Sequence, residues 1–398
     1  GVGRMTLLGW IIFIFALLFS IMLHEFGHFV TAKKFRMKVT QFFVGFGQTL
    51  WSTIRGETEY GVKAIPAGGY VKIIGMTALE DVDPEDEPRS FRRKPPWQRM
   101  IVLAAGSFMH FALAFVLLFI LAGGIGLSDT NSSTVGLVDP CVPTSITATS
   151  CAKSDPASPA VKAGLRTGDK IIAIGNTRVR NWTQLGAAIR AQKPGAPVAV
   201  VVLRSGHRVI LHPSMAVVHG RKGAYLGISP AVLYTTVNPV RAVTYAGSEF
   251  GQIVVGSVQA LGSIPKAIPE LFAKNRSSTA GGNVTSVVGA GEYTGEAFAA
   301  KVGWQTKVSI VLFIVISLNI FVGLFNLLPL LPLDGGHLAV VIYEQIRSWI
   351  ARLRRRPDPG LVDMRKLLPV SVGVFALLVG FGLLLIMADL VNPVHIPQ

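Results

Sequence analysis

The segment IMLHEFGHFV, at residues 21–30, places two histidines and a glutamate inside a stretch of apolar side chains. Within residues 7–29, His24, Glu25 and His28 are the only side chains that ionise. Each such group costs at least a few kcal/mol near the centre of a bilayer, and those that occur there are usually functional. These three residues are therefore the first candidates for chemistry.

Histidines four residues apart lie on one face of a helix, so His24 and His28 can bind the same cation. Zinc suits such a pair, because it accepts imidazole nitrogen and carboxylate oxygen and keeps an open position in catalytic sites. Glu25 follows the first histidine and is the candidate general base for a water molecule at that position. The alternative is a pair of helix-end histidines without a metal, which does not offset the cost of burying them.

A third ligand is expected from NLLPLLPLDGGH, at residues 326–337. Two prolines interrupt an apolar run there, and irregular backbone at membrane depth occurs only where protein or a cavity surrounds it. Asp334 is the candidate carboxylate ligand, and His337 is its rival. Asn326 is an amide that suits a substrate backbone or an oxyanion, or that bonds a neighbouring helix. His110, in another apolar run, is expected to bond a neighbouring helix.

The chain of 398 residues is 50% hydrophobic and only 15% charged, which excludes an ordinary soluble enzyme. Apolar runs long enough to cross a hydrocarbon core of about 30 Å occur at four places. They are residues 7–29, 101–122, 308–331 and 368–391. This pattern predicts a multi-pass membrane protein.

The net charge of +16 does not indicate a nucleic-acid partner, because the basic residues crowd the ends of the apolar runs. Such clusters mark the cytoplasmic side of a membrane. Residues 31–99 and 346–366 are therefore predicted inside, and 123–307 outside. His24 then lies about seventeen residues, or roughly 25 Å, into a span that starts outside. The chemistry is expected toward the cytoplasmic side.

Between the first two runs, QFFVGFGQTLW and YGVKAIPAGGYVKIIG combine β-prone residues with glycines. They predict a curled hairpin at the inner face of the membrane, where glycine lets another backbone approach closely. A purely structural hairpin is the alternative. The acidic residues 79–90 that follow predict an exposed, mobile loop.

The outer segment contains the phrase AGLRTGDKIIAIG, followed by a helix and two alternating strands. On these features, residues 133–230 resemble a bacterial, circularly permuted PDZ domain. A PDZ groove adds a peptide as an extra strand, although the fold can also serve only as a plug or size filter. Cys141 and Cys151, the only cysteines, fall here and either form a disulfide or remain free thiols. The helix that follows either lies on the outer membrane surface or packs on this module.

HEFGH in a first span, an outer PDZ module, NLLPLLPLDGG in a later span and a final PVSVGVFALLVG together resemble a bacterial site-2 protease. The resemblance implies a polytopic α-helical membrane protein with four transmembrane helices, a cytoplasmic-side β-hairpin and an inserted α/β PDZ domain. Its parts are 1–124 with two spans and the hairpin, 133–230 as the PDZ domain, 231–306 as a linker, and 307–398 with two spans. Such proteins lie in the bacterial plasma membrane.

The same resemblance implies one Zn²⁺ ion held by His24, His28 and Asp334, with Glu25 as the catalytic base. The implied substrates are single-span membrane proteins, typically anti-sigma factors that another protease has already cleaved outside. A transmembrane substrate must unwind to expose its carbonyls, and the hairpin would hold it as an extended strand. The candidate substrate-binding residues are Asn326, Phe43, Gly45, Gly47, Gly69 and Val71.

A non-catalytic membrane scaffold that displays the PDZ module is the competing hypothesis. Glu25 discriminates the two, because hydrolysis needs a base beside the metal ligands and a scaffold does not. A zinc sensor or transporter would need more ligands along a path across the bilayer, and the other spans offer almost none. The sequence therefore predicts a zinc metalloendopeptidase.

Overall fold

The structure is a computed structural model that describes residues 2–76, 80–144, 151–152, 154–220, 222–273, 276, 284–300 and 302–393. The chain divides into two compact units. One combines Gly1–Gly124 with Asn238–Gln398, and the other is Ile125–Val237. The residues with candidate chemistry all belong to the first unit.

Four helices of the first unit are long and apolar enough to cross a membrane, within the residues that the structure describes. They are α1 (Val2–Lys34), α2 (Pro96–Ile120), α7 (Trp304–Asn326) and α9 (Leu368–Val391). Each predicted span overlaps one of them. The third span was expected to continue to residue 331, and that end is wrong. The helix stops at Asn326, because Pro329 and Pro332 cannot continue its hydrogen-bond ladder.

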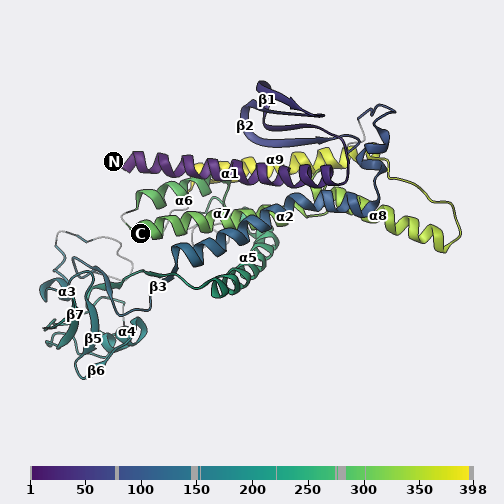
Figure 1. Cartoon of the computed structure of the whole chain (residues 1–398). Coiled ribbons are helices and arrows are strands. Elements are labelled where there is room, and N and C mark those ends of the chain that lie inside the picture. The colour runs from purple at the N-terminus through teal and green to yellow at the C-terminus, as the bar shows by residue number, and fades with distance from the viewer. Residues whose placement is uncertain are drawn as a thin grey trace. The chain divides into compact units, whose positions relative to one another are not determined.

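Helix α2 packs against both α1 and α7 (Figure 1). The α1 and α2 backbones approach closely at Gly27, where an added Cβ would lie 2.6 Å from the Ala105 carbonyl oxygen. Small residues commonly allow such contacts between membrane helices. Helix α8 (Asp334–Leu353) also packs on α2, and a buried ion pair of 2.8 Å joins Arg99 Nη1 to Glu344 Oε2 across them.

The strands expected after α1 are present as β1 (Val39–Arg55) and β2 (Thr58–Ile73), which pack near α1 (Figure 1). Phe43 lies opposite both Gly61 and Tyr70, so the first half of β1 runs between the two halves of β2. Within the described chain, residues 69–73 pair on one side only. The hairpin therefore presents residues 69–73 as an edge.

Residues 80–90, the described part of the segment expected to be an exposed, mobile loop, are mostly exposed or half-buried and form ion pairs with the hairpin side of the fold. This segment contains the short helix η1 (Glu87–Arg89), and η2 (Phe91–Arg93) begins directly after the segment. Glu57, in the β1–β2 turn, accepts hydrogen bonds of 2.8 Å from both Arg89 and Lys33. The Arg89 guanidinium and then the Lys33 ammonium hold the pKa of Glu57 at about 2, against the opposing effect of partial burial. These pairs connect the segment to the hairpin and to α1.

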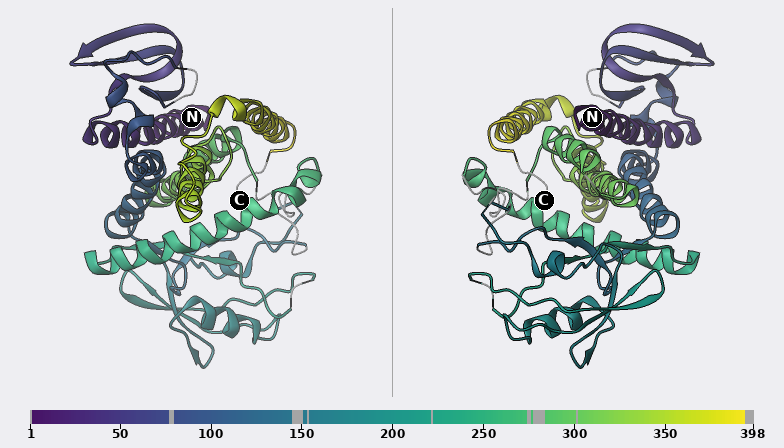
Figure 2. Two further views of the ribbon diagram at one scale, coloured as in Figure 1. Left: turned by 90° about the vertical axis from the view of Figure 1, so that its right-hand side faces the viewer. Right: turned by 90° about the vertical axis from the view of Figure 1, so that its left-hand side faces the viewer.

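Helix α5 (Pro239–Ala267) runs across α2 and α7 rather than along them (Figure 2). Its Ala246 packs in a buried cluster with Ala114 and Ile316 of those helices. The helix therefore packs on membrane-span candidates of the first unit, and its place on the outer membrane surface stays a prediction. Helix α6 (Val287–Ala299) packs on the first part of α1, where an added Cβ on Gly9 would lie 2.7 Å from the Thr294 carbonyl oxygen.

The second unit contains a four-stranded sheet in the order β6-β5-β7-β8. Its core gathers Ile171, Leu185 and Val202, which are all fully buried. A disulfide joins Cys141 to Cys151, so the first of the two sequence alternatives is correct. The elements are β3 (Leu127–Asp129), β4 (Val135–Val138), α3 (Pro159–Lys162), β5 (Lys170–Ile174), β6 (Thr177–Arg178), α4 (Trp182–Arg190), β7 (Val200–Arg204), β8 (His207–Leu211), β9 (Ile228–Pro230) and β10 (Leu233–Thr235).

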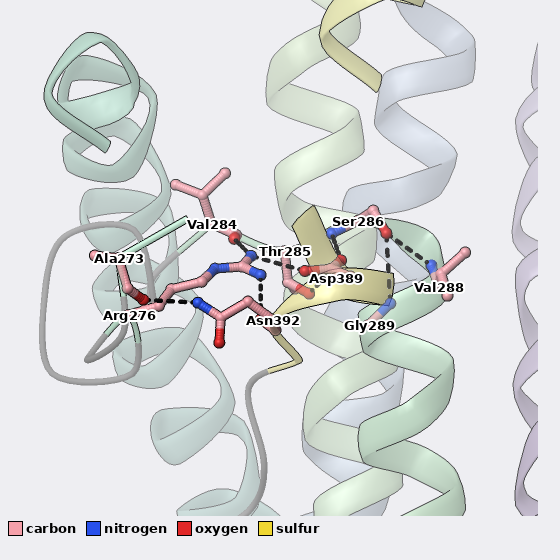
Figure 3. Close-up of polar contacts among 9 residues, drawn as sticks. All are labelled: Ala273, Arg276, Val284, Thr285, Ser286, Val288, Gly289, Asp389 and Asn392. Atoms are coloured by element: carbon pink, nitrogen blue, oxygen red, sulfur yellow. Dashed lines mark hydrogen bonds and ion pairs between the residues drawn. The ribbon is translucent and has the colours of Figure 1, made fainter. Parts of the chain in front are cut away.

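A buried polar cluster holds the C-terminal end of α9 (Figure 3). Asp389 accepts hydrogen bonds from Arg276 Nη2 at 2.7 Å, from the Ser286 backbone N–H at 2.6 Å and from Thr285 Oγ1 at 3.1 Å. The Arg276 Nη1 donates to the Asn392 carbonyl oxygen at 2.9 Å. The Asp389 and Arg276 side chains are each 1% exposed. The other buried residues of α9 are Leu385 and Ala388, so this cluster is its main polar attachment.

Replacing Asp389 with Ala should lower the free energy of unfolding by about 3–5 kcal/mol, because a buried guanidinium loses its carboxylate partner. Thermal unfolding of the purified protein in detergent measures the effect as a fall in Tm. The double variant Arg276→Met, Asp389→Leu removes both charges and should recover most of the loss. An Asp389→Ala protein with the Tm of the unmodified chain would contradict this role.

Candidate metal centre

Three potential ligand atoms converge between α1 and the start of α8. His24 Nε2 lies 3.1 Å from His28 Nε2, and Asp334 Oδ2 lies 3.2 and 3.3 Å from these two nitrogens. In the described parts of the chain, this is the one group of three or more such side chains close enough for a metal. Zinc keeps about 2.0–2.2 Å from nitrogen and oxygen ligands, which places tetrahedral ligands about 3.3 Å apart. The triangle therefore fits zinc.

The turn at residues 327–333 positions Asp334 as the first residue of α8. Gly335 and Gly336 allow this turn to fold against the helix, since an added Cβ on Gly336 would lie 2.5 Å from the Leu331 backbone nitrogen. His337 lies one helical turn farther on and lines a cavity of about 230 Å³ with Arg99 and Glu344. The structure thus brings Asp334, and not His337, to the histidine pair.

The orientation of His28 is set by a backbone atom of α2. Its Nδ1 lies 2.7 Å from the Val102 carbonyl oxygen, which can only accept a hydrogen bond. Nδ1 therefore carries the proton, and the lone pair of Nε2 faces His24 and Asp334. This is the usual arrangement of a metal-ligating histidine. Sequence analysis did not identify Val102, because a carbonyl partner leaves no mark in the side-chain pattern.

Gly106 forms the α2 wall of the centre. An added Cβ there would lie 2.5 Å from His28 Nε2 and 2.6 Å from His24 Nδ1. Any side chain would therefore displace the imidazoles. Gly106 is a second residue that sequence analysis missed, although a glycine within an apolar span is a visible signal of close helix contact.

Glu25 lies beside the histidine pair and contacts the edge of the hairpin. Its Oε2 accepts a hydrogen bond of 3.1 Å from the Val71 backbone N–H. Gly69 lies next to α1 as well, because an added Cβ would clash with the Met22 sulfur. Of the expected substrate-binding residues, Val71 thus contacts the candidate base, and Gly69 lies against the preceding turn of α1.

The other expected substrate-binding residues belong to β1 and to the end of α7. Phe43 is on the neighbouring strand, where its buried ring stacks on Tyr70 at a centroid distance of 5.7 Å. Gly45 and Gly47 have positive φ and form the bend of β1. Asn326 is the last residue of α7, before the 327–333 turn. Gly335, which follows Asp334, packs against the Leu327 backbone directly after Asn326. A role for these four expected residues in substrate binding stays a prediction.

A different asparagine is buried near the centre. Asn319 Oδ1 lies 2.8 Å from His110 Nδ1, and its Nδ2 donates to Ser20 Oγ at 3.0 Å and to the Val315 carbonyl oxygen at 2.8 Å. His110 therefore bonds a neighbouring helix, as expected. An amide within an apolar run was the signal that would have identified Asn319.

Replacing Gly106 with Ala should lower zinc affinity by at least about 10-fold, because the methyl group displaces both imidazoles. Competition with a chromogenic chelator measures the affinity in detergent. Gly380→Ala is the matched control, since an added Cβ at Gly380 meets nothing within 4 Å. It should leave zinc affinity unchanged. Equal zinc affinity in Gly106→Ala and Gly380→Ala would show that α2 does not pack closely against the two imidazoles.

Comparisons with known proteins agree with this geometry. The sequence model of peptidase family M50 matches residues 12–356. The zinc metalloprotease Rip1 of Mycobacterium tuberculosis is 34% identical over 417 residues, which cover 99% of this chain and 100% of the relative. Rip1 of Mycolicibacterium smegmatis is 36% identical over 98% of this chain and 99% of its own. A putative zinc metalloprotease of Fusobacterium nucleatum is 30% identical over 88% of this chain and 91% of its own.

These matches extend over the histidine pair, Glu25 and Asp334, and over most of the chain. They confirm the family, the zinc cofactor and the enzyme class that the sequence predicts. The chain belongs to peptidase family M50, the site-2 protease family of zinc metalloproteases.

Proposed function

We propose that this protein is an intramembrane endopeptidase in which His24, His28 and Asp334 hold one zinc ion and Glu25 is the general base. The observation that carries the proposal is the triangle of ligand atoms 3.1 to 3.3 Å apart. It joins α1, a helix apolar enough to cross a membrane, to the first residue of α8. When bound, zinc polarises a carbonyl and lowers the pKa of water toward 7.

Glu25 performs the proton transfers. Its carboxylate takes a proton from the attacking water as the new C–O bond forms, and it delivers that proton to the amine nitrogen as the peptide C–N bond breaks. The products are a carboxylate and an amine. The contact of Glu25 with Val71 supports this role, because a peptide aligned with the hairpin edge lies beside the base.

The hairpin edge binds the unwound substrate. A transmembrane helix satisfies its own backbone groups, so an extended segment needs replacement partners at membrane depth. Residues 69–73 supply one row of such partners, since they pair on one side only within the described residues. Strand addition of this kind accepts many side-chain sequences. The substrates are single-span membrane proteins, with anti-sigma factors already trimmed outside as the main class.

The active site faces the cytoplasm, and the Ile125–Val237 unit lies outside the plasma membrane. The basic residues at the ends of the spans support this orientation. The disulfide in the outer unit supports it as well, because disulfides persist in oxidising compartments. A cavity of about 290 Å³ between α4 and residues 225–228 supports a PDZ-type groove in this unit. A peptide there would pair beside β9.

Glu25→Gln tests the proposed base. The amide keeps the shape but cannot accept the water proton, so cleavage of a model transmembrane peptide should fall by about 10²–10⁴-fold. Zinc content should stay at the level of the unmodified protein. Glu249→Gln on α5 is a control that should change neither. A Glu25→Gln protein that cleaves at the normal rate would refute the peptidase mechanism.

Val71→Pro tests the edge. The Val71 N–H points to Glu25, so proline removes an outward donor without removing a ladder hydrogen bond. The cleavage rate per folded, zinc-loaded molecule should fall at least about 10-fold for a transmembrane peptide, because the edge loses a backbone donor. Val71→Ala keeps the N–H and should have a mild effect. If both variants cleave at the unmodified rate, the edge does not bind substrate.

A further inference from the structure

His24 has a buried nitrogen that the centre described above leaves without a partner. Its Nδ1 is inaccessible to solvent and makes no hydrogen bond to any described atom. His28 differs, because its Nδ1 donates to the Val102 carbonyl oxygen. Histidines that bind a metal through one nitrogen almost always donate the other N–H to an acceptor. An acceptor for His24 is therefore expected nearby.

The ring of His110 is next to His24. The ring centroids are 5.0 Å apart with planes inclined by 43°, and His110 is 3% exposed. This separation leaves room for an N–H···N hydrogen bond of about 2.9 Å once the rings turn edge to edge.

The protonation of His110 follows from its other neighbour. Asn319 donates through Nδ2 to the Val315 carbonyl oxygen, which can only accept, so the amide Oδ1 faces His110. Oδ1 can only accept as well. His110 Nδ1 therefore carries the proton, and in the neutral ring Nε2 keeps a lone pair. The hydrogen bond from His110 Nδ1 to Asn319 therefore leaves Nε2 of the same ring as an acceptor.

We infer that His110 Nε2 accepts the Nδ1–H of His24 when His24 Nε2 is a zinc ligand. The inference rests on the proposed function, in which His24 binds zinc. It makes His110 a positioning residue at the end of a chain of hydrogen bonds from Ser20 through Asn319. These residues come from α1, α7 and α2, so the packing of three helices sets the orientation of one ligand.

The bond has a defined consequence for metal binding. A histidine whose Nδ1–H is held by an acceptor presents its Nε2 lone pair to the metal, whereas an unheld ring also takes the tautomer with the proton on Nε2. Loss of such an outer partner lowers metal affinity by about 10- to 100-fold. Ser107 is a competing partner, because its hydroxyl on α2 is also buried and bonds to no described atom.

Two substitutions of His110 separate its two nitrogens. Asn places an amide where Nδ1 was, so it keeps a partner for Asn319 and loses the contact with His24. Gln reaches the position of Nε2, where its carbonyl oxygen can accept from His24. Zinc affinity by chelator competition, and the visible absorption spectrum of the Co²⁺-substituted protein, are the readouts. Neither depends on proteolysis.

His110→Asn should weaken zinc binding by about 10- to 100-fold and change the Co²⁺ spectrum, with the Tm of the metal-free protein unchanged. His110→Gln should keep the zinc affinity close to that of the unmodified protein, because its carbonyl oxygen can accept from His24. Ser107→Ala should bind zinc normally. Unchanged affinity and spectrum in His110→Asn would overturn the inference, as would a loss of affinity in Ser107→Ala.

His24→Ala separates this inference from the proposed function. If His24→Ala loses zinc while His110→Asn keeps it, the ligand assignment stands and the role of His110 is wrong. If His24→Ala binds zinc as tightly as the unmodified protein, the ligand assignment itself fails. If His110→Asn lowers the Tm of the metal-free protein as well as the zinc affinity, the loss of zinc comes from disturbed helix packing, and the inferred hydrogen bond is wrong.

Discussion

The cost of placing two imidazoles and two carboxylates among apolar helices is the constraint on which the rest of this structure depends. His24, His28 and Asp334 offset it by converging to about 3.2 Å, the spacing of ligands around one zinc ion. Convergence requires residues far apart in the chain to be fixed together. The buried pair of Arg99 and Glu344 ties α8 to α2 for this purpose, and so locates the helix that begins with Asp334.

Close packing and hydrogen bonding act together around the ligands. The glycine at position 106 lets the α2 backbone touch both rings, and the nearby Val102 carbonyl oxygen orients His28. Helix α2 thus supplies a wall and an acceptor, although it contributes no metal ligand. Its central position against α1 and α7 follows from this role, because a shift of α2 would change the angle of an imidazole.

The sequence was sufficient for the parts of the site that local spacing defines. The histidine pair and Glu25 lie on one helix turn, and the strands after α1 follow from β-prone runs. Contacts across helices were not accessible. Val102 is 74 residues from His28, and Asn319 is 209 residues from His110, so no local pattern joins them. Asp334 was preferred to His337 from the sequence and the family resemblance, and the fold adds the turn at residues 327–333 that places Asp334 at the start of α8.

Under the proposed function, the hydrogen bond from the Val71 N–H to Glu25 links substrate binding to catalysis. An edge strand has backbone N–H groups without a ladder partner, and each of them needs another acceptor. Glu25 satisfies one of them at 3.1 Å. In the proposed function, a substrate strand that pairs with the same edge would compete for this N–H and would release the Glu25 carboxylate beside the substrate backbone. The carboxylate that would leave the Val71 N–H is the one that takes the water proton. The same hydrogen bond would therefore hold Glu25 before substrate binds and free it when substrate pairs with the edge.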